Sequence, residues 1–215
     1  MRPLIILRPE PGASRTAEQA RRLGLDPRVV PLFELVPLAW TAPYPSEFDA
    51  LVITSANAVR FGGSELDRLK DLPVHAVGEA SAAAARQAGF AIASAGTGGI
   101  EAMELPASQR LLHLAGLDHQ PVQSAVAIPV YEARPIAQPA GLAALADGVV
   151  AVHSPRAGRR LGELVAERSA IAIAAISPVA AASCGDGWQE VAAAAQPSDA
   201  ALLALAARLC ETPGP

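Results

Sequence analysis

The sequence predicts an α/β fold of two lobes, each a mainly parallel sheet flanked by helices, with a two-strand connector between the lobes. Short β-branched runs alternate with alanine-rich helical stretches, which is typical of parallel sheets. The length of 215 residues suits two small domains. Two extended, proline-bearing segments, 33–40 and 128–135, do not lead directly into a helix. They therefore indicate connectors that flank a middle lobe.

The N-terminal residues give the clearest unit. Residues 4–7 (LIIL) read as a buried strand, followed by a Pro/Gly turn and a helix over 14–23. Gly24 is the expected stop of that helix. Residues 28–32 read as the next strand.

Further strands and helices follow from the same patterns. In the middle lobe, strands are expected near 50–53, 74–77, 91–94, 111–114 and 125–128. After the second connector, strands are expected near 149–152 and 170–176. Helices are expected over 156–167, over 179–182 with a continuation through 195, and over 199–209.

Four strand exits share one construction, in which a small polar residue leads from a strand into a helix. They are ITSANAV with Ser55, AVGEASAAA with Ser81, AVHSPRAG with Ser154, and AAISPVAAA with Ser177. In the last two, serine at the N-cap precedes proline at the first helical position, which needs no N–H donor.

Such turns favour an anionic ligand. In a doubly wound sheet they lie at the carboxyl ends of the strands, where ligands bind, and helix starts offer free N–H groups and partial positive charge. Any single serine is most simply an N-cap and nothing more. Four such turns divided between two lobes indicate a cleft for a ligand with several negative groups.

Composition excludes some classes of partner. The net charge of −4 argues against nucleic acid. The longest apolar stretch, 170–184, is broken by Ser177 and Pro178 and is too short for a membrane span. The N-terminus reads as a strand and lacks a signal-peptide cleavage site. Cys184 and Cys210 have no CxxC spacing, so we expect a reduced, cytoplasmic chain, although two cysteines leave a disulfide open.

The remaining motifs do not indicate a phosphate-binding, metal or nucleophilic site. The segment 96–101 (GTGGIE) lacks the spacing of a dinucleotide or phosphate-binding loop and is expected to be a flexible strand-to-helix turn. The four histidines fall on separate elements, and no spacing implies zinc. His113 and His119 are expected to occupy ordinary strand or loop positions, although a place near a site stays open. No nucleophile motif is present.

The ordered set of turns resembles the uroporphyrinogen-III synthase family over nearly the whole chain. The matching segments are LRPEPGASRTAEQARRLG, FDALVITSANAVRF, VHAVGEASAAAARQAGF, LLHLAG, VYEARP, VVAVHSPRAGRRL and IAAISPVAAAS…PSDAALLALA. The resemblance implies a discontinuous first domain of residues 1–34 plus 135–215. A second domain would span 39–129, with connectors at 35–38 and 130–134.

The resemblance also implies a hydro-lyase of haem biosynthesis that needs no metal or cofactor. Its substrate would be hydroxymethylbilane, a linear tetrapyrrole with eight carboxylates, closed with inversion of ring D and loss of water. The family implies a cytoplasmic monomer, without nucleic-acid or membrane partners, that has at most transient contact with the upstream synthase.

The resemblance and the strand-exit turns together give the candidate substrate-binding residues. They are Arg8, Ser55, Asn57, Ser81, Ser154, Arg156, Arg160 and Ser177. No residue is assigned as catalytic.

Two departures from the family's pattern stand out. Arg160 occupies a position where the family often has a tyrosine, proposed to assist loss of the hydroxyl. Val179 and Ala180 replace hydroxyl residues that are common there. Arginine is a poor general acid, because its pKa lies far above neutral. Arg160 is therefore expected to bind a carboxylate, or to be simply a solvated helix residue. The alternative function is a catalytically weakened two-lobed tetrapyrrole-binding protein.

Overall fold

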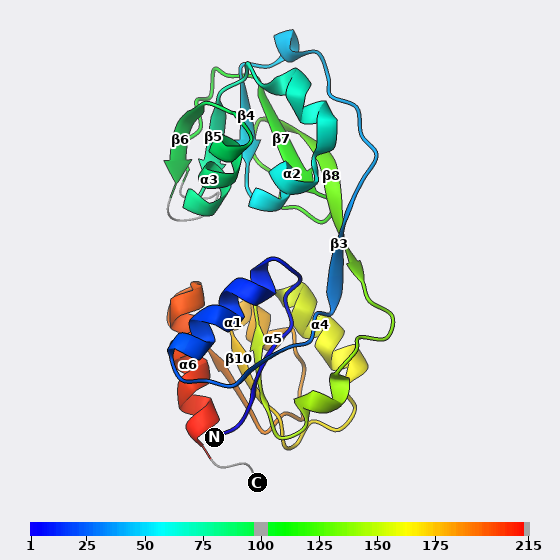
Figure 1. The fold of residues 1–215 in the computed structure, drawn as a ribbon, viewed down its shortest axis with the longest axis vertical. Coiled ribbons are helices and arrows are strands. Elements are labelled where there is room, and N and C mark those ends of the chain that lie inside the picture. The colour runs from blue at the N-terminus through cyan, green and yellow to red at the C-terminus, as the bar shows by residue number, and fades with distance from the viewer. Residues whose placement is uncertain (97–102, 213–215) are drawn as a thin grey trace. The chain divides into compact units, whose positions relative to one another are not determined.

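The structure is a computed structural model that describes residues 1–96 and 103–212. Nearly all of the turn expected over 96–101 lies outside these residues. The chain divides into two compact units: unit 1 consists of Met1–Glu34 and Pro135–Pro215, and unit 2 of Leu35–Arg134. Each unit is an α/β structure built on a sheet of mainly parallel strands, as the sequence predicts (Figure 1).

Unit 1 contains a five-stranded parallel sheet in the order β11-β10-β9-β1-β2. Its strands are β1 (Leu4–Ile6), β2 (Pro27–Val29), β9 (Val149–Val152), β10 (Ala172–Ala175) and β11 (Glu190–Ala193). Its helices are α1 (Gly12–Arg22), α4 (Pro155–Leu164), α5 (Pro178–Ala182) and α6 (Asp199–Glu211), with a short 3₁₀ helix η4 (Leu142–Leu145). Strand order reverses between β1 and β9, so the topological switch point of unit 1 lies there.

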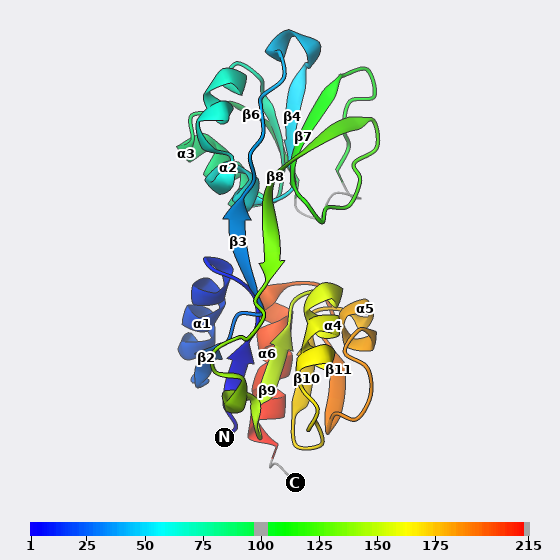
Figure 2. The ribbon, with the colours of Figure 1, turned by 90° about the vertical axis from the view of Figure 1, so that its right-hand side faces the viewer.

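Alternation along the strands places the helices of unit 1. Leu4 and Ile6 of β1 share one buried cluster with Val149 and Ala151 of β9 and with the apolar faces of α1 and α6. The helices α4 and α5 pack against each other, separately from α1 and α6 (Figure 2). Side chains alternate along a strand, so the residues two positions beyond Ile6 and Ala151 point to the same face of the sheet as these two. That face is the one covered by α1 and α6.

The prediction of a helix from 179 through 195 is correct only for the beginning of that segment. Helix α5 ends at Ala182, and Glu190–Ala193 forms the edge strand β11, which pairs in parallel with β10. Gly185 and Gly187 have φ values of +73° and +90°, which turn the chain after the helix. Alanine favours helix in isolation, but pairing with a neighbouring strand overrides that preference.

Unit 2 contains a six-stranded sheet in the order β3-β8-β7-β4-β5-β6. Its strands are β3 (Phe33–Pro37), β4 (Ala50–Ile53), β5 (Val74–Val77), β6 (Ile92–Gly96), β7 (Leu111–Gly116) and β8 (Ala125–Pro135). Its helices are α2 (Ala56–Phe61) and α3 (Glu79–Gln87), with 3₁₀ helices η1 (Pro45–Glu47) and η2 (Gly63–Leu69). The strands β4 to β8 are parallel, and their order reverses between β4 and β7. That pair forms the switch point of unit 2.

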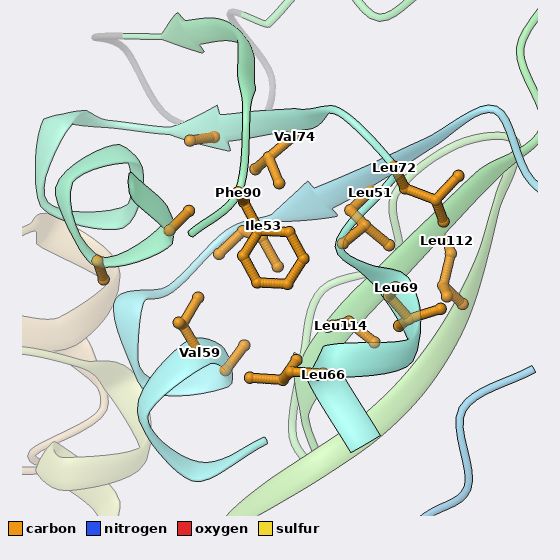
Figure 3. Close-up of a cluster of buried hydrophobic side chains, with 14 of the residues drawn as sticks. Leu51, Ile53, Val59, Leu66, Leu69, Leu72, Val74, Phe90, Leu112 and Leu114 are labelled. Atoms are coloured by element: carbon orange, nitrogen blue, oxygen red, sulfur yellow. The ribbon is translucent and has the colours of Figure 1, made fainter. Parts of the chain in front are cut away.

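The core of unit 2 lies between its sheet and the helices α2 and α3 (Figure 3). Leu51 and Ile53 of β4 point into it with Leu112 and Leu114 of β7. Residues of opposite parity, including Val52, face the other side of the sheet in a smaller buried cluster. The polar residues that continue this second face carry the pocket described below.

The two extended segments link the units as β3 and β8, which run in opposite directions (Figure 2). Hydrogen bonds join them near both ends: the Leu38 amide donates to the Val130 carbonyl, and the Ile136 amide donates to the Leu32 carbonyl. The second segment differs from expectation, because the strand expected at 125–128 and the connector that follows are one continuous strand, paired to β7 on its first half.

Within the described ranges, every helix is too short or too polar to cross a bilayer.

Candidate functional site

Three of the four serine turns are helix N-caps. The Oγ atoms of Ser55, Ser154 and Ser177 accept hydrogen bonds from the backbone amides two or three residues later, at 3.2, 3.1 and 3.3 Å. These serines begin α2, α4 and α5, directly after β4, β9 and β10. Each hydroxyl has its own proton left to donate.

Ser81 has a different place from the other three. It is the third residue of α3, and the N-cap of that helix is Gly78, whose φ is +88°. The expectation that Ser81 lies at the cap is therefore wrong. Its side chain is buried, with 3% of the residue exposed. A role in binding substrate stays a prediction.

A charged cluster occupies the switch point of unit 1. Arg8 follows β1, and its Nη1 atom donates to both carboxylate oxygens of Asp199 at 2.9 and 3.2 Å and to Thr16 Oγ1 at 3.2 Å. His153 follows β9, and its Nε2 atom lies 3.7 Å from Asp199 Oδ1. Asp199 is the first residue of α6, where a carboxylate is favoured by the helix dipole. Arg8 thus already has a carboxylate partner within the chain.

His153 is a neutral member of this cluster. Its pKa is lowered to about 4, chiefly by burial and also by the nearby Arg8, while Asp199 acts in the opposite direction. Neither ring nitrogen has a hydrogen-bond partner among the described residues, and the side chain is 8% exposed. The ionised groups of this switch point therefore bind one another, and the imidazole beside them stays uncharged at neutral pH.

A pocket occupies the switch point of unit 2. Its volume is about 270 Å³. It is lined by residues at the carboxyl ends of the strands and in the loop after β7, namely Thr54, Val77, Gly116, Asp118, His119, Gln120 and Tyr131. A Cβ atom at Gly116 would lie 2.8 Å from Tyr131 Cζ and 3.0 Å from its hydroxyl, so a larger residue there would need the Tyr131 side chain to move.

A buried histidine lies behind this pocket. His113 has no exposed surface, and its Nε2 atom is 2.9 Å from Thr54 Oγ1. Its ring packs edge-on against His119, with centroids 5.4 Å apart. The pKa of His113 is lowered to about 4, chiefly by burial and also by the nearby His119. At neutral pH, His113 is therefore a neutral partner of the Thr54 hydroxyl.

Arg160 is held by the backbone of its own unit. Its Nη2 atom donates to the carbonyls of Ile136 and Ala137 at 3.1 and 3.4 Å, and Nη1 donates to Glu163 Oε2 at 3.0 Å. Its Nε atom is buried without a partner among the described residues. A substrate carboxylate would have to compete with these contacts.

Asn57 and Arg156 also have partners. Asn57 Oδ1 accepts from Arg60 Nη1 at 3.2 Å, and the backbone N–H of Asn57 donates to Ser55 Oγ. The Arg156 guanidinium lies 4.6 Å from the centre of the Phe33 ring, a cation–π contact. Both side chains are partly exposed next to helix starts.

A larger cavity of about 440 Å³ lies elsewhere in unit 2. It is lined by residues that precede or begin β7 and β8, including Leu111 and Val122. That is the amino edge of the sheet, whereas ligands of doubly wound folds bind at the carboxyl edge. We therefore take the smaller, polar pocket as the candidate site.

Sequence reasoning missed Thr54, Gln120 and Tyr131 and gave His113 and His119 ordinary positions. One partial signal was available, because alternation places Thr54 on the same face of its strand as Val52. The pairing of Val52 with His113, which brings Thr54 close to the imidazole, becomes known only with the fold.

Two units built on parallel sheets with helices define a class of α/β proteins, and such sheets bind their ligands at the carboxyl edges. The sequence profile of the family described as Uroporphyrinogen-III synthase HemD matches residues 14–204. The chain therefore belongs to the uroporphyrinogen-III synthase family.

Solved structures agree with this fold. A uroporphyrinogen-III synthetase from Helicobacter pylori matches with a TM-score of 0.67 at 17% identity, over 97% of this chain and 100% of that one. A mutant uroporphyrinogen III synthase from the extremely thermophilic bacterium Thermus thermophilus matches with a TM-score of 0.55 at 14% identity, over 98% and 100%. The comparison with curated proteins found no significant match.

Membership of the family identifies the chain as a cyclising lyase of haem biosynthesis. Its substrate is a small molecule, the linear tetrapyrrole of this pathway step.

Proposed function

We propose that the chain binds hydroxymethylbilane through the strand exits of both units and releases uroporphyrinogen III and one water. The observation that carries this proposal is the gathering of polar side chains and helix starts at the carboxyl edge of each sheet. Eight carboxylates on a flexible ligand need many separated donors, and two such edges provide them.

The proposed reaction begins at the hydroxymethyl carbon of ring A. The C–O bond breaks, and the hydroxyl leaves with a proton as water, which leaves an electrophilic azafulvene. The substituted carbon of ring D attacks it to give a spiro intermediate. The bond between that ring D carbon and the bridge to ring C then breaks, and the freed bridge carbon bonds to the unsubstituted α-carbon of ring D, which inverts the ring. Loss of the proton from that α-carbon restores the pyrrole.

The protein's main contribution in this scheme is positioning. Because the same substrate closes without inversion when free, the enzyme must hold one folded conformation and exclude the easier closure. Holding reacting groups in place can supply about 7–11 kcal/mol in favourable cases. Charge-assisted hydrogen bonds to the carboxylates contribute about 1.5–3 kcal/mol each. Ordering a flexible ligand offsets part of this.

The residues proposed to bind the carboxylates differ in how available they are. Ser55, Ser154 and Ser177 each keep a hydroxyl proton to donate. Asn57 and Arg156 are partly exposed but have contacts within the chain. Arg8, Ser81 and Arg160 are buried or held by hydrogen bonds within the chain. We expect the three serines to carry more of the binding.

Finer points of the assignment are part of the same proposal. Residues 1–34 with 135–215, and residues 39–129, are proposed to act as the two domains, linked by 35–38 and 130–134. The enzyme is proposed to work as a cytoplasmic monomer without a cofactor, and to receive its unstable substrate through transient contact with the upstream synthase.

An isomer assay tests the proposal. Purified protein is given hydroxymethylbilane, and the products are oxidised and separated into type I and type III uroporphyrin. We expect the type III isomer in excess over an enzyme-free control. Only type I product, together with tight binding of the bilane, would instead support a catalytically weakened tetrapyrrole-binding protein.

A further inference from the structure

We propose that the 270 Å³ pocket of unit 2 binds one carboxylate arm of the substrate, and that buried His113 fixes the Thr54 hydroxyl so that it donates into this pocket. The inference rests on the proposed substrate and names one binding position for it. His113 is a positioning residue, because it lies behind Thr54 and has no exposed surface.

The tautomer of His113 decides the direction of the Thr54 proton. Nδ1 of His113 is buried without a hydrogen-bond partner among the described residues. If Nδ1 carried the proton, a buried N–H donor would be left without an acceptor, which is the rarer and costlier case. The proton therefore belongs on Nε2, and Nε2–H donates to Thr54 Oγ1 over 2.9 Å. The hydroxyl proton of Thr54 is then free for a ligand.

The electrostatics keep this arrangement constant near neutral pH. The pKa of His113, lowered to about 4, leaves the ring neutral there, and protonation at lower pH would still leave Nε2–H donating. The titratable group that faces His113 is His119, whose ring packs edge-on against it. His119 Nδ1 donates to the Gly116 carbonyl over 2.9 Å, so that nitrogen carries a proton.

The remaining lining supplies further hydrogen-bond donors for a carboxylate. The Tyr131 hydroxyl and the Gln120 amide can each donate a hydrogen bond alongside Thr54. A carboxylate accepts from several donors at once, and such charge-assisted bonds are stronger than neutral ones. Asp118 also lines the pocket and opposes an anion, but it is exposed, where water weakens its field.

The first experiment measures binding of a fragment by NMR on the free enzyme, without turnover. Propionate represents one acidic arm, and propionamide is its uncharged control of the same size. We expect saturable propionate binding with a Kd of about 1–10 mM, the affinity that a few hydrogen bonds to one small anion give. Propionamide should bind at least about tenfold more weakly. Equal binding of both, or of neither, would overturn the subsite whatever the isomer assay shows.

The second experiment uses matched variants. Thr54→Val should raise the KM for hydroxymethylbilane and the Kd for propionate about tenfold, which corresponds to one lost hydrogen bond. Thr54→Ser, which keeps the hydroxyl, should restore both. Asp118→Asn should strengthen propionate binding.

The same readouts test the role of His113. His113→Leu should behave like Thr54→Val, whereas His113→Gln, whose amide nitrogen can replace Nε2–H, should retain binding. Because leucine suits a buried strand position between Leu112 and Leu114, the Leu variant should unfold no more easily than the parent at pH 7. Parent-like propionate binding in His113→Leu, or equal losses in the Leu and Gln variants, would overturn the positioning role.

Discussion

At the switch point of unit 1, Arg8 after β1 is bound by Asp199 of α6 beside the neutral His153, whereas at the switch point of unit 2 Thr54 after β4 and the loop after β7 line a pocket. Arg8 is paired with Asp199 over 2.9 Å, while Thr54 keeps its hydroxyl proton beside a space of about 270 Å³. Both edges also place a neutral, buried histidine next to the polar group, His153 in one and His113 in the other.

The difference shows that a polar strand exit is not by itself a binding site. Arginine matches carboxylates well, and Arg8 has found one inside its own unit. In unit 1, the groups left for a ligand are the serine caps and the backbone amides of the helix starts. In unit 2, the donors that line the pocket, Thr54, Gln120 and Tyr131, are uncharged.

The largest expected effect concerns acid sensitivity. The pKa values of His113 and His153 fall from 6.5 to about 4 on folding. Between those values the unfolded chain binds more protons, so the free energy of unfolding decreases as pH falls from 6.5 towards 4 and then levels off. Each histidine can account for about 3 kcal/mol. Urea unfolding across this pH range measures the loss, and His113→Leu should remove its share. If the free energy of unfolding of His113→Leu fell with pH as steeply as that of the parent, the account would be contradicted.

The second effect concerns the ion pair of unit 1. Asp199→Asn leaves Arg8 and Thr16 without their carboxylate partner and removes a negative charge from the start of α6. We expect a loss of about 1–3 kcal/mol in the free energy of unfolding. Propionate binding to unit 2 should not change. If Asp199→Asn left the free energy of unfolding unchanged, the ion pair would contribute nothing to the fold. Arg8 could then bind a ligand without a loss of stability.

A smaller effect is expected from Arg160→Ala. The variant loses the hydrogen bonds to the carbonyls of Ile136 and Ala137, where the chain re-enters unit 1. We expect about 1 kcal/mol of lost stability, which thermal unfolding can detect. The matched control is Arg159→Ala, a change of its exposed neighbour, which should have little effect. A rise in the KM without a change in stability would return Arg160 to the carboxylate-binding residues.

The smallest effect is expected at an ion pair outside both switch points. Glu79 and Arg86 pair at 2.7 Å, but their side chains are 74% and 51% exposed. Glu79→Gln should change the free energy of unfolding by less than about 0.5 kcal/mol. If Glu79→Gln lost as much stability as Asp199→Asn, the contribution of an ion pair to stability would not depend on where it lies in the fold.

The sequence predicted much of the fold because its strands are short apolar runs bounded by turn residues. It failed at Glu190–Ala193, where an alanine-rich segment is compatible with helix until pairing with β10 decides for strand. Serine followed by proline correctly predicted the caps at Ser154 and Ser177. Such local signals depend only on neighbouring residues.

The site was less predictable, because its contacts join distant parts of the chain. Arg8 and Asp199 are 191 positions apart, and Thr54 and His113 are 59 apart. No local sequence pattern predicts that Arg8 forms an ion pair with a carboxylate of its own unit. Strand order, which brings these residues to one edge, becomes known only with the fold.

One measurement compares the two switch points directly: titration of the free enzyme with propionate, followed through backbone amide signals in NMR spectra. The account predicts saturable shifts for residues at the unit 2 edge, around Thr54 and Gly116, and little change around Arg8, Thr16 and Asp199. Shifts confined to the Arg8 cluster, with none around Thr54, would contradict it.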